Sequence, residues 1–387
     1  MALGVSLLGC TGSIGRSALA VLARHPDAFR IVALASHRNS AGLMEAARAV
    51  APDLAVLVDD TVAGVESDGV PAGVTLRTGR AALLEAAAHP DADIVINAVV
   101  GAAGLEATLT ALNAGRRLAL ANKESLVAGG PLVLRALASA GGQLVPIDSE
   151  HSAILQCLAG EDRGGVRRVI LTASGGPFRG ATVEAMAGAT PEQALRHPTW
   201  AMGAKISVDS ASLANKALEV IETHFLFGLG YDSIETVVHP QSIIHSMVEF
   251  IDGSIVAQMG FPTMELPILY ALTWPDRRCD TASRPFDPVE AGTLTFEALD
   301  RARFPAFGLG IDAGRTGGTA PAVFNAANEV AVAGFLSGRL PFGGLAGVID
   351  AALSAHETKA VDSLETVLDA DRQAREVAAN AVRKHGI

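Results

Sequence analysis

The first 150 residues alternate between short apolar runs and segments with apolar residues at helical spacing. The apolar runs are VSLLG, RIVALAS, DIVINAVV and RRLALAN, and SALAVLARHP is one of the helical segments between them. Apolar runs of this length predict buried strands, and strands that alternate with helices predict βαβ units in a parallel sheet. We therefore predict an α/β chain whose N-terminal domain, residues 1–148, is Rossmann-like.

Beyond residue 148 the pattern is mixed and then mainly helical. HSAILQCLAG and SVDSASLANKALEVIETHFLFG predict helices and VRRVILTA predicts a strand, so residues 149–275 are expected to form a central α+β domain. The run TWPDRRCDTASRPFDPVEAG, rich in Pro, Asp and Arg, indicates a linker, which we place at 276–300. Helical spacing then returns, and a C-terminal helical bundle is predicted for 301–387.

The helix predicted after Asp209 carries an unusual polar stripe. At 100° per residue its apolar residues form one arc, made of Leu213, Ala217, Val220, Ile221 and Phe225. The opposite stripe consists of Ser212, Asn215, Lys216 and Glu219. Such a stripe is ordinarily a solvated helix face. Ser210, Asn215 and Lys216 would nevertheless suit a phosphate, and Glu219 would suit a cation.

Composition narrows the class of protein. The 387 residues are 49% hydrophobic and 18% charged, which is typical of a well-packed soluble protein of two or three domains. A formal net charge of −11 argues against a nucleic-acid partner. Three scattered cysteines (Cys10, Cys157, Cys279) predict neither a disulfide framework nor a zinc cluster, and fit the cytoplasm. No apolar run approaches the length of a membrane span, so no membrane partner is expected.

A glycine turn after the first predicted strand indicates a nucleotide site. The sequence from Gly9 to Gly15 has the spacing GxxGxxG and opens a helix, where glycines let the backbone approach a pyrophosphate. The second strand ends in SHRN without the acid that NAD-preferring domains carry. Arg38 could instead pair with a 2′-phosphate, so we predict NADP(H) as the cofactor. An ordinary surface arginine is the alternative.

Asp148 and Glu150 lie one residue apart where a strand is expected to meet a helix. In an extended segment residues i and i+2 point to the same side, so both acids would face one small volume. Two like charges held so close need a proton or a cation between them, and Mg²⁺ or Mn²⁺ suits an all-oxygen ligand set. The alternative is a helix N-terminus decorated with acids.

Three further segments could carry chemistry. Lys123, in a loop predicted to follow RRLALA, could meet a phosphate or a carbonyl, and Ser174 follows a strand in a Ser-Gly-Gly turn suited to an anion. The run RHPTWAMGAKIS has no clear period and suggests a mobile lid with Trp200 and Met202 on it and His197 at its base. Each could also be an ordinary loop.

Together these segments resemble the 1-deoxy-D-xylulose 5-phosphate reductoisomerase family. The matching stretches are GCTGSIG, ANKESLV, PIDSEHSAI, LTASGGPFRG, HPTWAMGAKISVDSASLANKALEVIE, VVHPQSIIHSMVEF and FNAANEVAV. The resemblance implies a homodimeric oxidoreductase of isoprenoid precursor biosynthesis, in which residues 1–148 bind NADPH and residues 149–275 form the catalytic and dimerisation domain. It would use NADPH and Mg²⁺ or Mn²⁺, with Co²⁺ also suitable. The implied substrate is a phosphorylated sugar, 1-deoxy-D-xylulose 5-phosphate, isomerised and reduced to 2-C-methyl-D-erythritol 4-phosphate by a retro-aldol/aldol or an α-ketol route.

The resemblance also implies roles for individual residues. The metal ligands would be Asp148, Glu150 and Glu219, which with Lys123 and His197 form the catalytic set. The substrate contacts would be Lys123, Ser149, Glu150, Ser174, His197, Ser210, Asn215, Lys216 and Glu219. The cofactor contacts would be Thr11, Gly12, Ser13, Ile14, His37, Arg38, Asn39, Asn122, Glu124 and Gly203. His37 is a departure, because the family often has glycine there.

Two other readings make different predictions. Another NADP-dependent dehydrogenase, of a phosphorylated or semialdehyde substrate, would need a reactive cysteine or a lysine–aspartate pair. A catalytically inactive NADPH-binding regulator would be expected to lack one of Asp148, Glu150, Glu219 or Lys216, and all four are present.

Overall fold

The computed structural model describes residues 2–61, 69–200 and 202–385, and these form two compact units. The first unit comprises Met1–Ser125, Val133–Asp148 and Thr263–Ser283, and the second comprises Leu126–Leu132, Ser149–Pro262 and Arg284–Ile387. Within the described residues no helix is both long and apolar enough to cross a membrane.

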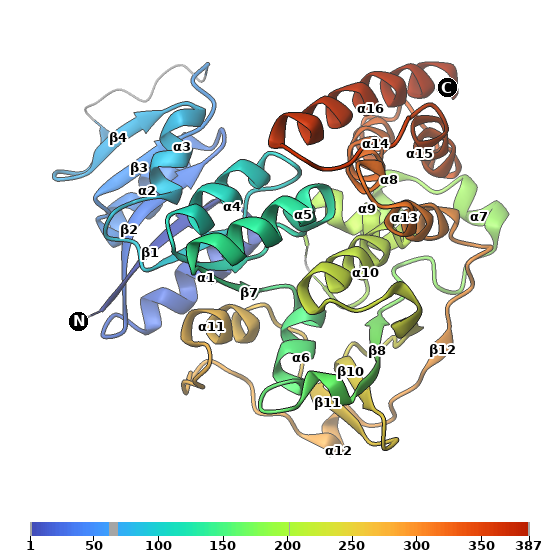
Figure 1. The fold of residues 1–387 in the computed structure, drawn as a ribbon, viewed down its shortest axis with the longest axis horizontal. Helices are drawn as coiled ribbons and strands as arrows, with labels where there is room; N and C mark the ends of the chain where they lie inside the picture. Colours follow the sequence, from blue (N-terminus) through green and yellow to red (C-terminus); the bar gives the residue numbers. More distant parts are fainter. Residues whose placement is uncertain (1, 62–68, 201, 386–387) are drawn as a thin grey trace. The chain divides into compact units, whose positions relative to one another are not determined.

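The first unit contains the predicted parallel sheet (Figure 1). Its seven strands, in spatial order, are β4 (Thr75–Thr78), β3 (Leu54–Leu57), β2 (Phe29–Ser36), β1 (Leu3–Leu8), β5 (Ile94–Asn97), β6 (Arg117–Leu120) and β7 (Gln143–Pro146). All neighbouring pairs are parallel. The central strands are almost wholly buried because helices cover both faces, which explains their continuous apolar runs.

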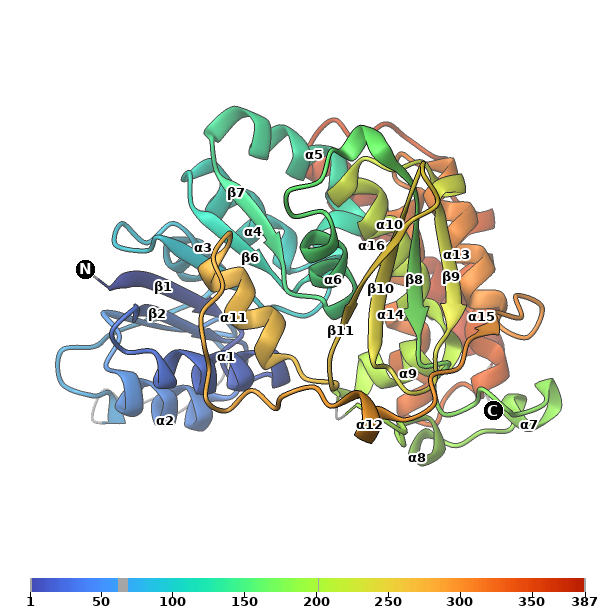
Figure 2. The ribbon, with the colours of Figure 1, turned by 90° about the horizontal axis from the view of Figure 1, so that it is seen from below.

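Helices flank this sheet on both sides (Figure 2). On one face lie α1 (Ser13–Arg24), α2 (Ser40–Val50) and α11 (Glu265–Thr273), and on the other α3 (Arg80–Ala87) and α4 (Gly104–Asn113). The strand order reverses between β1 and β5, and open α/β sheets bind ligands beside such a reversal, at the carboxyl ends of the strands. The predicted glycine turn follows β1 at this point.

The second unit is built on a mixed sheet and a group of helices. Its strands, in spatial order, are β11 (Ile255–Met259), β10 (Ile244–Phe250), β8 (Val166–Ala173), β9 (Ile234–Val238) and β12 (Glu297–Ala298). Strands β8 and β9 are parallel, and the other pairs are antiparallel. Strand β12 and the short helix α12 (Pro288–Ala291) lie within the segment predicted as a linker.

The predicted C-terminal helices are present and pack on one another. They are α13 (Pro305–Thr316), α14 (Ala320–Leu336), α15 (Leu345–Ser354) and α16 (Leu364–His385). Their apolar residues, including Phe307, Phe324 and Phe335, join residues of β8 and β10 in one hydrophobic core. The predicted fold class, with a Rossmann-like parallel sheet, a second mixed sheet and a helical C-terminal region, is confirmed.

The prediction of one continuous helix after Asp209 is wrong. The segment forms two helices, α9 (Ala204–Ser212) and α10 (Ala214–Phe227), separated by Leu213. Leu213 adopts a left-handed conformation with φ +58°, which a leucine tolerates only when its surroundings hold it there. Its side chain is buried in the core, so apolar burial offsets the cost of that backbone conformation.

Candidate active site

The glycine turn at the end of β1 is shaped for close approach. Gly9 has φ +90°, and a Cβ there would lie 2.4 Å from the carbonyl oxygen of Ala98. A Cβ on Gly15 would lie 2.2 Å from the carbonyl oxygen of Gly9. Gly12 precedes the first residue of α1, and no side chain caps that end of the helix. These are the features that let a helix N-terminus accept a pyrophosphate.

The predicted adenosine-end residues follow β2. The Arg38 side chain is 71% exposed, and its Nε donates to Asp59 Oδ2 at 2.5 Å. The Thr61 hydroxyl and the Arg38 guanidinium lower the pKa of Asp59 to about 2. Asn39 accepts a hydrogen bond from the backbone N–H of Gly42 and so caps α2, while His37 is exposed. A cationic, exposed Arg38 fits the predicted role in binding a 2′-phosphate.

The segment predicted as a loop around Lys123 is the start of helix α5 (Lys123–Ala140). Asn122 precedes it, and its Nδ2 donates to the carbonyl oxygens of Val99 (2.8 Å) and Gly101 (2.9 Å) and to Glu124 Oε2 (3.0 Å). Lys123 is buried and forms an ion pair with Asp148. A buried lysine needs such a counter-charge, because its desolvation is costly.

Asp148 and Glu150 do not lie on one extended strand, as the sequence argument assumed. Strand β7 ends at Pro146, and helix α6 (Ser149–Cys157) begins between the two acids. Asp148 ends the first unit and is joined through Ser149 to Glu150, so the chain itself keeps the two carboxylates together. One oxygen from each of Asp148, Glu150 and Glu219 lies within 4.8 Å of the other two. An all-oxygen group of three carboxylates is the donor set that Mg²⁺ and Mn²⁺ prefer.

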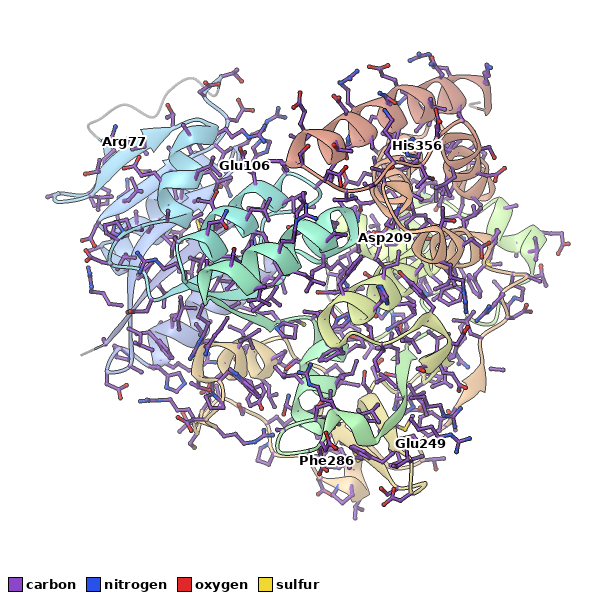
Figure 3. All side chains as sticks on the ribbon, viewed as in Figure 1. Arg77, Glu106, Asp209, Glu249, Phe286 and His356 are labelled. Carbon is purple, nitrogen blue, oxygen red and sulfur yellow. The ribbon has the colours of Figure 1, made fainter. Side chains whose placement is uncertain are left out.

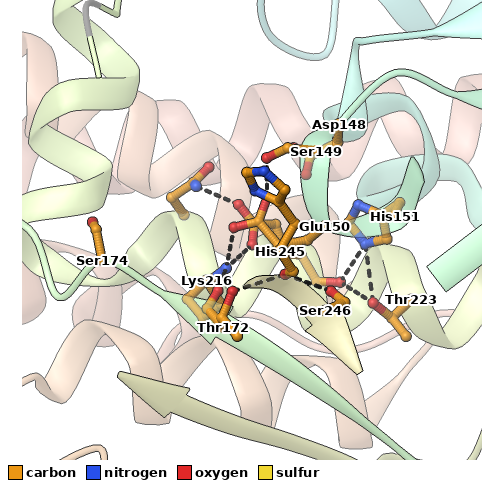
Figure 4. A network of polar contacts seen from close by, with 12 residues as sticks. Asp148, Ser149, Glu150, His151, Thr172, Ser174, Lys216, Thr223, His245 and Ser246 are labelled. Atoms are coloured by element: carbon orange, nitrogen blue, oxygen red, sulfur yellow. Dashed lines mark hydrogen bonds and ion pairs between the residues drawn. The ribbon is translucent and has the colours of Figure 1, made fainter. Parts of the chain in front are cut away.

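The polar stripe of α10 is buried, so its reading as a solvated helix face is wrong. Lys216 and Glu219 are 3% and 1% exposed. Lys216 Nζ donates to Glu150 Oε1 at 2.7 Å and to the carbonyl oxygen of Thr172 (Figure 4). It also forms an ion pair with Glu219. Burial by itself would lower the pKa of Lys216, but the two carboxylates outweigh that effect and raise it. Lys216 is therefore an ammonium cation.

Ser174 and His197 contact each other at the end of β8. Ser174 Oγ lies 2.8 Å from His197 Nε2, and His197 Nδ1 accepts the backbone N–H groups of Thr199 (3.1 Å) and Trp200 (2.9 Å). Burial lowers the pKa of His197, which favours the neutral ring. Since Nδ1 is an acceptor, the proton of the neutral ring is on Nε2 and is donated to Ser174 Oγ. The Ser174 hydroxyl can then donate its own proton to a ligand oxygen.

The predicted lid segment has no helix or strand among its described residues up to Gly203. Trp200 is half-buried, and its ring lies 6.2 Å from that of His245, while Met202 is also half-buried. Ala201, in the middle of the segment, lies outside the described residues. Gly203, predicted to touch the cofactor, precedes α9 in the second unit. The lid role of Trp200 and Met202 stays a prediction.

Ser210 lies on α9 beside a buried acid. Asp209, labelled in Figure 3, is 1% exposed and pairs with Lys205 Nζ at 2.9 Å, one turn earlier on the helix. Its other oxygen accepts a hydrogen bond from Asn328 Nδ2 at 2.8 Å. Asn328 comes from the run FNAANE on α14, to which sequence reasoning gave no role. This bond fixes α9 to α14 and thereby positions Ser210.

Sequence reasoning also passed over a buried pair behind the carboxylates. His151 and Glu222 are both 0% exposed, and His151 Nδ1 lies 3.2 Å from Glu222 Oε2. His151 Nε2 lies 2.9 Å from the carbonyl oxygen of Glu219. The pair joins α6, which carries Glu150, to α10, which carries Glu219. Glu222 follows Glu219 by three residues, and this helical spacing was the signal in the sequence.

The thiols do not form a catalytic centre. Burial raises the pKa of Cys10 to about 12 and that of Cys157 to about 11, so both stay protonated and unreactive at neutral pH. Cys279 is exposed, and all three cysteines are free. A dehydrogenase that uses a buried, activated thiolate is therefore disfavoured.

Comparison with family models gives a consistent assignment along the chain. Residues 5–130 match the model described as 1-deoxy-D-xylulose 5-phosphate reductoisomerase. Residues 144–227 match its C-terminal domain model, and residues 259–377 match a further model described as the DXP reductoisomerase C-terminal domain.

Individual proteins agree with the family models. The chain is 50% identical to a 1-deoxy-D-xylulose 5-phosphate reductoisomerase from Aromatoleum aromaticum over 386 residues, covering 98% of this chain and 96% of that protein. It is also 50% identical to the corresponding protein from Xanthomonas oryzae pv. oryzae, covering 99% and 98%.

Solved structures extend the likeness to three dimensions. The enzyme from Zymomonas mobilis in complex with NADPH has a TM-score of 0.91 and 43% identity, covering 99% of both chains. A DOX-P reductoisomerase in complex with NADPH, fosmidomycin and magnesium has a TM-score of 0.92 and 37% identity, covering 98% of both.

Proposed function

The chain belongs to the 1-deoxy-D-xylulose 5-phosphate reductoisomerase family, and from this we propose which of its residues carry the reaction. The enzyme isomerises 1-deoxy-D-xylulose 5-phosphate and reduces it to 2-C-methyl-D-erythritol 4-phosphate, with NADPH and a divalent metal ion. The observation that carries the residue assignment is the group of three carboxylate oxygens from Asp148, Glu150 and Glu219, all within 4.8 Å of one another.

We assign the cation to these three carboxylates. Mg²⁺, Mn²⁺ or Co²⁺ bound there supplies a Lewis acid that polarises a substrate oxygen. The protein has to hold three negative charges close together. Lys123 offsets their repulsion by pairing with Asp148, and Lys216 does so by pairing with Glu150 and Glu219. Helices α6 and α10 supply two of the carboxylates from rigid elements, so their separation is fixed by packing.

We assign the substrate phosphate to Ser174, Ser210, Asn215 and Lys216, with His197 orienting Ser174. His197 Nε2–H donates to Ser174 Oγ, so the Ser174 hydroxyl can donate its own proton to a phosphate oxygen. Remote binding energy of this kind holds the reacting end in place without taking part in the chemistry. Trp200 and Met202, as a lid, would exclude water from the reacting groups.

We assign NADPH to the first unit, where it supplies the hydride. The glycine turn at Thr11, Gly12, Ser13 and Ile14 would accept the pyrophosphate, and Arg38 would face the 2′-phosphate. His37 and Asn39 flank Arg38, and Asn122 and Glu124 stand at the start of α5. Gly203, before α9, completes the proposed set.

The activity is tested by mixing protein, NADPH, Mg²⁺ and 1-deoxy-D-xylulose 5-phosphate and following absorbance of the reduced nicotinamide. Oxidation that depends on substrate and stops on addition of a chelator is expected. Glu219→Gln, with the fold intact, should lower kcat by orders of magnitude, whereas Glu365→Gln, an exposed glutamate of α16, should not. Near-normal turnover of Glu219→Gln at saturating Mg²⁺ contradicts the metal assignment.

We further propose a homodimer joined through β11. This strand is the edge of the five-stranded sheet, and its apolar side chains are open to solvent: Ile255, Val256 and Met259 are 51%, 39% and 38% exposed. An unpaired edge with exposed apolar residues is a template for pairing with a second copy. Val256→Lys should give a monomer in sedimentation experiments, while Val289→Lys, on the exposed helix α12, should not. A dimer that survives Val256→Lys contradicts this interface.

The cytoplasm is the compartment we propose, together with a role in isoprenoid precursor biosynthesis. The three free cysteines fit a reducing compartment.

A further inference from the structure

The side chains assigned to the substrate phosphate are bonded to the carboxylates assigned to the cation. Lys216 Nζ bonds Glu150 Oε1 at 2.7 Å and pairs with Glu219 Oε2. Asn215 Nδ2 donates to the other oxygen of Glu219. Both oxygens of Glu219 and one of Glu150 are thus held by Asn215 and Lys216, which are also assigned to the phosphate (Figure 4 shows the contact of Lys216 with Glu150).

From these contacts we propose that Asn215 and Lys216 couple cation binding to binding of the phosphorylated substrate. The proposal rests on the metal and phosphate assignments of the proposed function. A phosphate that takes the Asn215 amide and the Lys216 ammonium withdraws them from Glu150 and Glu219, and so frees carboxylate oxygens for the cation. A cation that takes those oxygens frees the two donors for the phosphate.

The number of N–H donors on Lys216 makes a phosphate compete with the carboxylates for this side chain. An ammonium group has three N–H donors, and those of Lys216 face Glu150, Glu219 and the carbonyl oxygen of Thr172. Lys216 therefore has no donor left for a phosphate until one of these bonds is broken. Glu219 is constrained by charge instead: each of its oxygens keeps a second lone pair, but a cation on Oε2 would lie beside the Lys216 ammonium, which repels it.

Burial makes the two events depend on each other. Glu219 and Lys216 are 1% and 3% exposed, so water cannot easily replace a lost partner. Removing one partner from a buried ion pair is strongly unfavourable, because the other charge is left uncompensated. The carboxylates can give up Lys216 if a divalent cation replaces it, and Lys216 can leave them if a phosphate receives it. The cation thus replaces the positive charge that the carboxylates lose when Lys216 leaves, and the phosphate replaces the negative charge that Lys216 loses.

Coupling of this kind is reciprocal by thermodynamic necessity. If phosphate tightens cation binding by some factor, the cation tightens phosphate binding by the same factor. A direct attraction between the cation and the phosphate would also give a positive coupling. Asn215 separates the two explanations, because it is neutral. Removing its amide weakens phosphate binding itself and removes the competition for Glu219, but it leaves the charges, and therefore the direct attraction, in place.

The experiment measures Mn²⁺ binding to the full-length protein by calorimetry, with and without saturating methyl phosphate. We expect methyl phosphate to lower the Kd for Mn²⁺ at least roughly fivefold in the wild type, and Mn²⁺ to lower the Kd for methyl phosphate equally. In Asn215→Ala the factor should fall to less than half its wild-type value, and in Lys216→Met it should approach one. Without phosphate, Lys216→Met should bind Mn²⁺ at least as tightly as the wild type.

A matched variant controls for the loss of a charge. Lys384→Met removes a lysine exposed on α16 and should keep the full coupling factor. Thermal unfolding establishes that each variant is folded. If Mn²⁺ binds and wild-type binding is unchanged by methyl phosphate, the coupling is refuted while the metal site stands. An equal factor in wild type, Asn215→Ala and Lys216→Met refutes it as well. Absence of Mn²⁺ binding, or binding unaffected by Glu219→Gln, overturns the metal assignment itself.

Discussion

Replacing Glu222 by leucine should destabilise the second unit and weaken its hold on a cation. Glu222 is fully buried, and its Oε2 lies 3.2 Å from His151 Nδ1. His151 Nε2 lies 2.9 Å from the carbonyl oxygen of Glu219 and 3.0 Å from Thr223 Oγ1, which itself donates to that carbonyl. A carbonyl only accepts, so Nε2 carries a proton, and Nδ1 is the ring nitrogen that faces the Glu222 carboxylate.

The size of the effect follows from burial. Breaking a buried pair by removing one partner costs about 3–5 kcal/mol. For a unit of this size each kcal/mol lowers Tm by about 2–4 °C, so Glu222→Leu should melt about 6–20 °C below the wild type. Glu222→Gln can still hydrogen-bond a neutral His151, so its loss should stay near 1 kcal/mol.

Two measurements check this reasoning. Differential scanning calorimetry gives the Tm of each variant, and calorimetric titration gives its affinity for Mn²⁺. Because the pair holds α6 against α10, which carry Glu150 and Glu219, Glu222→Leu should also weaken Mn²⁺ binding about tenfold. A Tm within 1 °C or so of the wild type, together with unchanged Mn²⁺ affinity, would show that the pair contributes neither stability nor positioning.

Three further outcomes are expected. Arg38→Ala should raise the Kd for NADPH about tenfold or more, because a charged hydrogen bond of about 1.5–3 kcal/mol is lost, and should change the Kd for NADH little. Nicotinamide fluorescence measures both Kd values, and an equal change for both cofactors refutes the 2′-phosphate role. Gly15→Ala should impair NADPH binding because its Cβ would lie 2.2 Å from the Gly9 carbonyl oxygen, whereas Gly308→Ala, with open space around its Cβ, should bind normally. Burial lowers the pKa of His197 below its ordinary 6.5. As the pH falls, the unfolded chain therefore takes up the proton before the folded protein does. The contribution of the neutral ring to stability is present above pH 6.5 and is lost as the pH falls below it. An NMR titration midpoint of His197 at or above 6.5 contradicts that assignment.

The nucleotide unit could be predicted from the sequence because its signals are local. Continuous apolar runs such as RIVALAS identify buried strands wherever they occur, and β2 covers Phe29–Ser36 as that run implies. The glycine turn is equally local, since Gly9 and Gly15 are required by contacts within a few residues or with the neighbouring strand. Periodicity and turn chemistry therefore predict this unit without knowledge of the rest.

The break between α9 and α10 could not be predicted in the same way. No proline or glycine marks Leu213, and the helical period of SVDSASLANKALEV continues through it. The left-handed conformation is imposed by the core that buries the Leu213 side chain, and that core is assembled from segments distant in sequence. Tertiary packing overrides local preference here, which local patterns cannot reveal.

The polar stripe of α10 shows why the site itself needed both kinds of information. A solvated stripe and a buried one have the same sequence pattern, and only the structure reveals that Lys216 and Glu219 are almost fully enclosed. Burial changes what these ion pairs contribute to the free energy of folding. On a surface such a pair contributes little to stability, whereas a buried charge is strongly destabilising without its partner. A fold that keeps Lys123, Asp148, Glu150, Lys216 and Glu219 largely out of water carries a cost that apolar residues would avoid. That cost has a reason if the same charged groups must later bind a cation and a phosphate in place of one another.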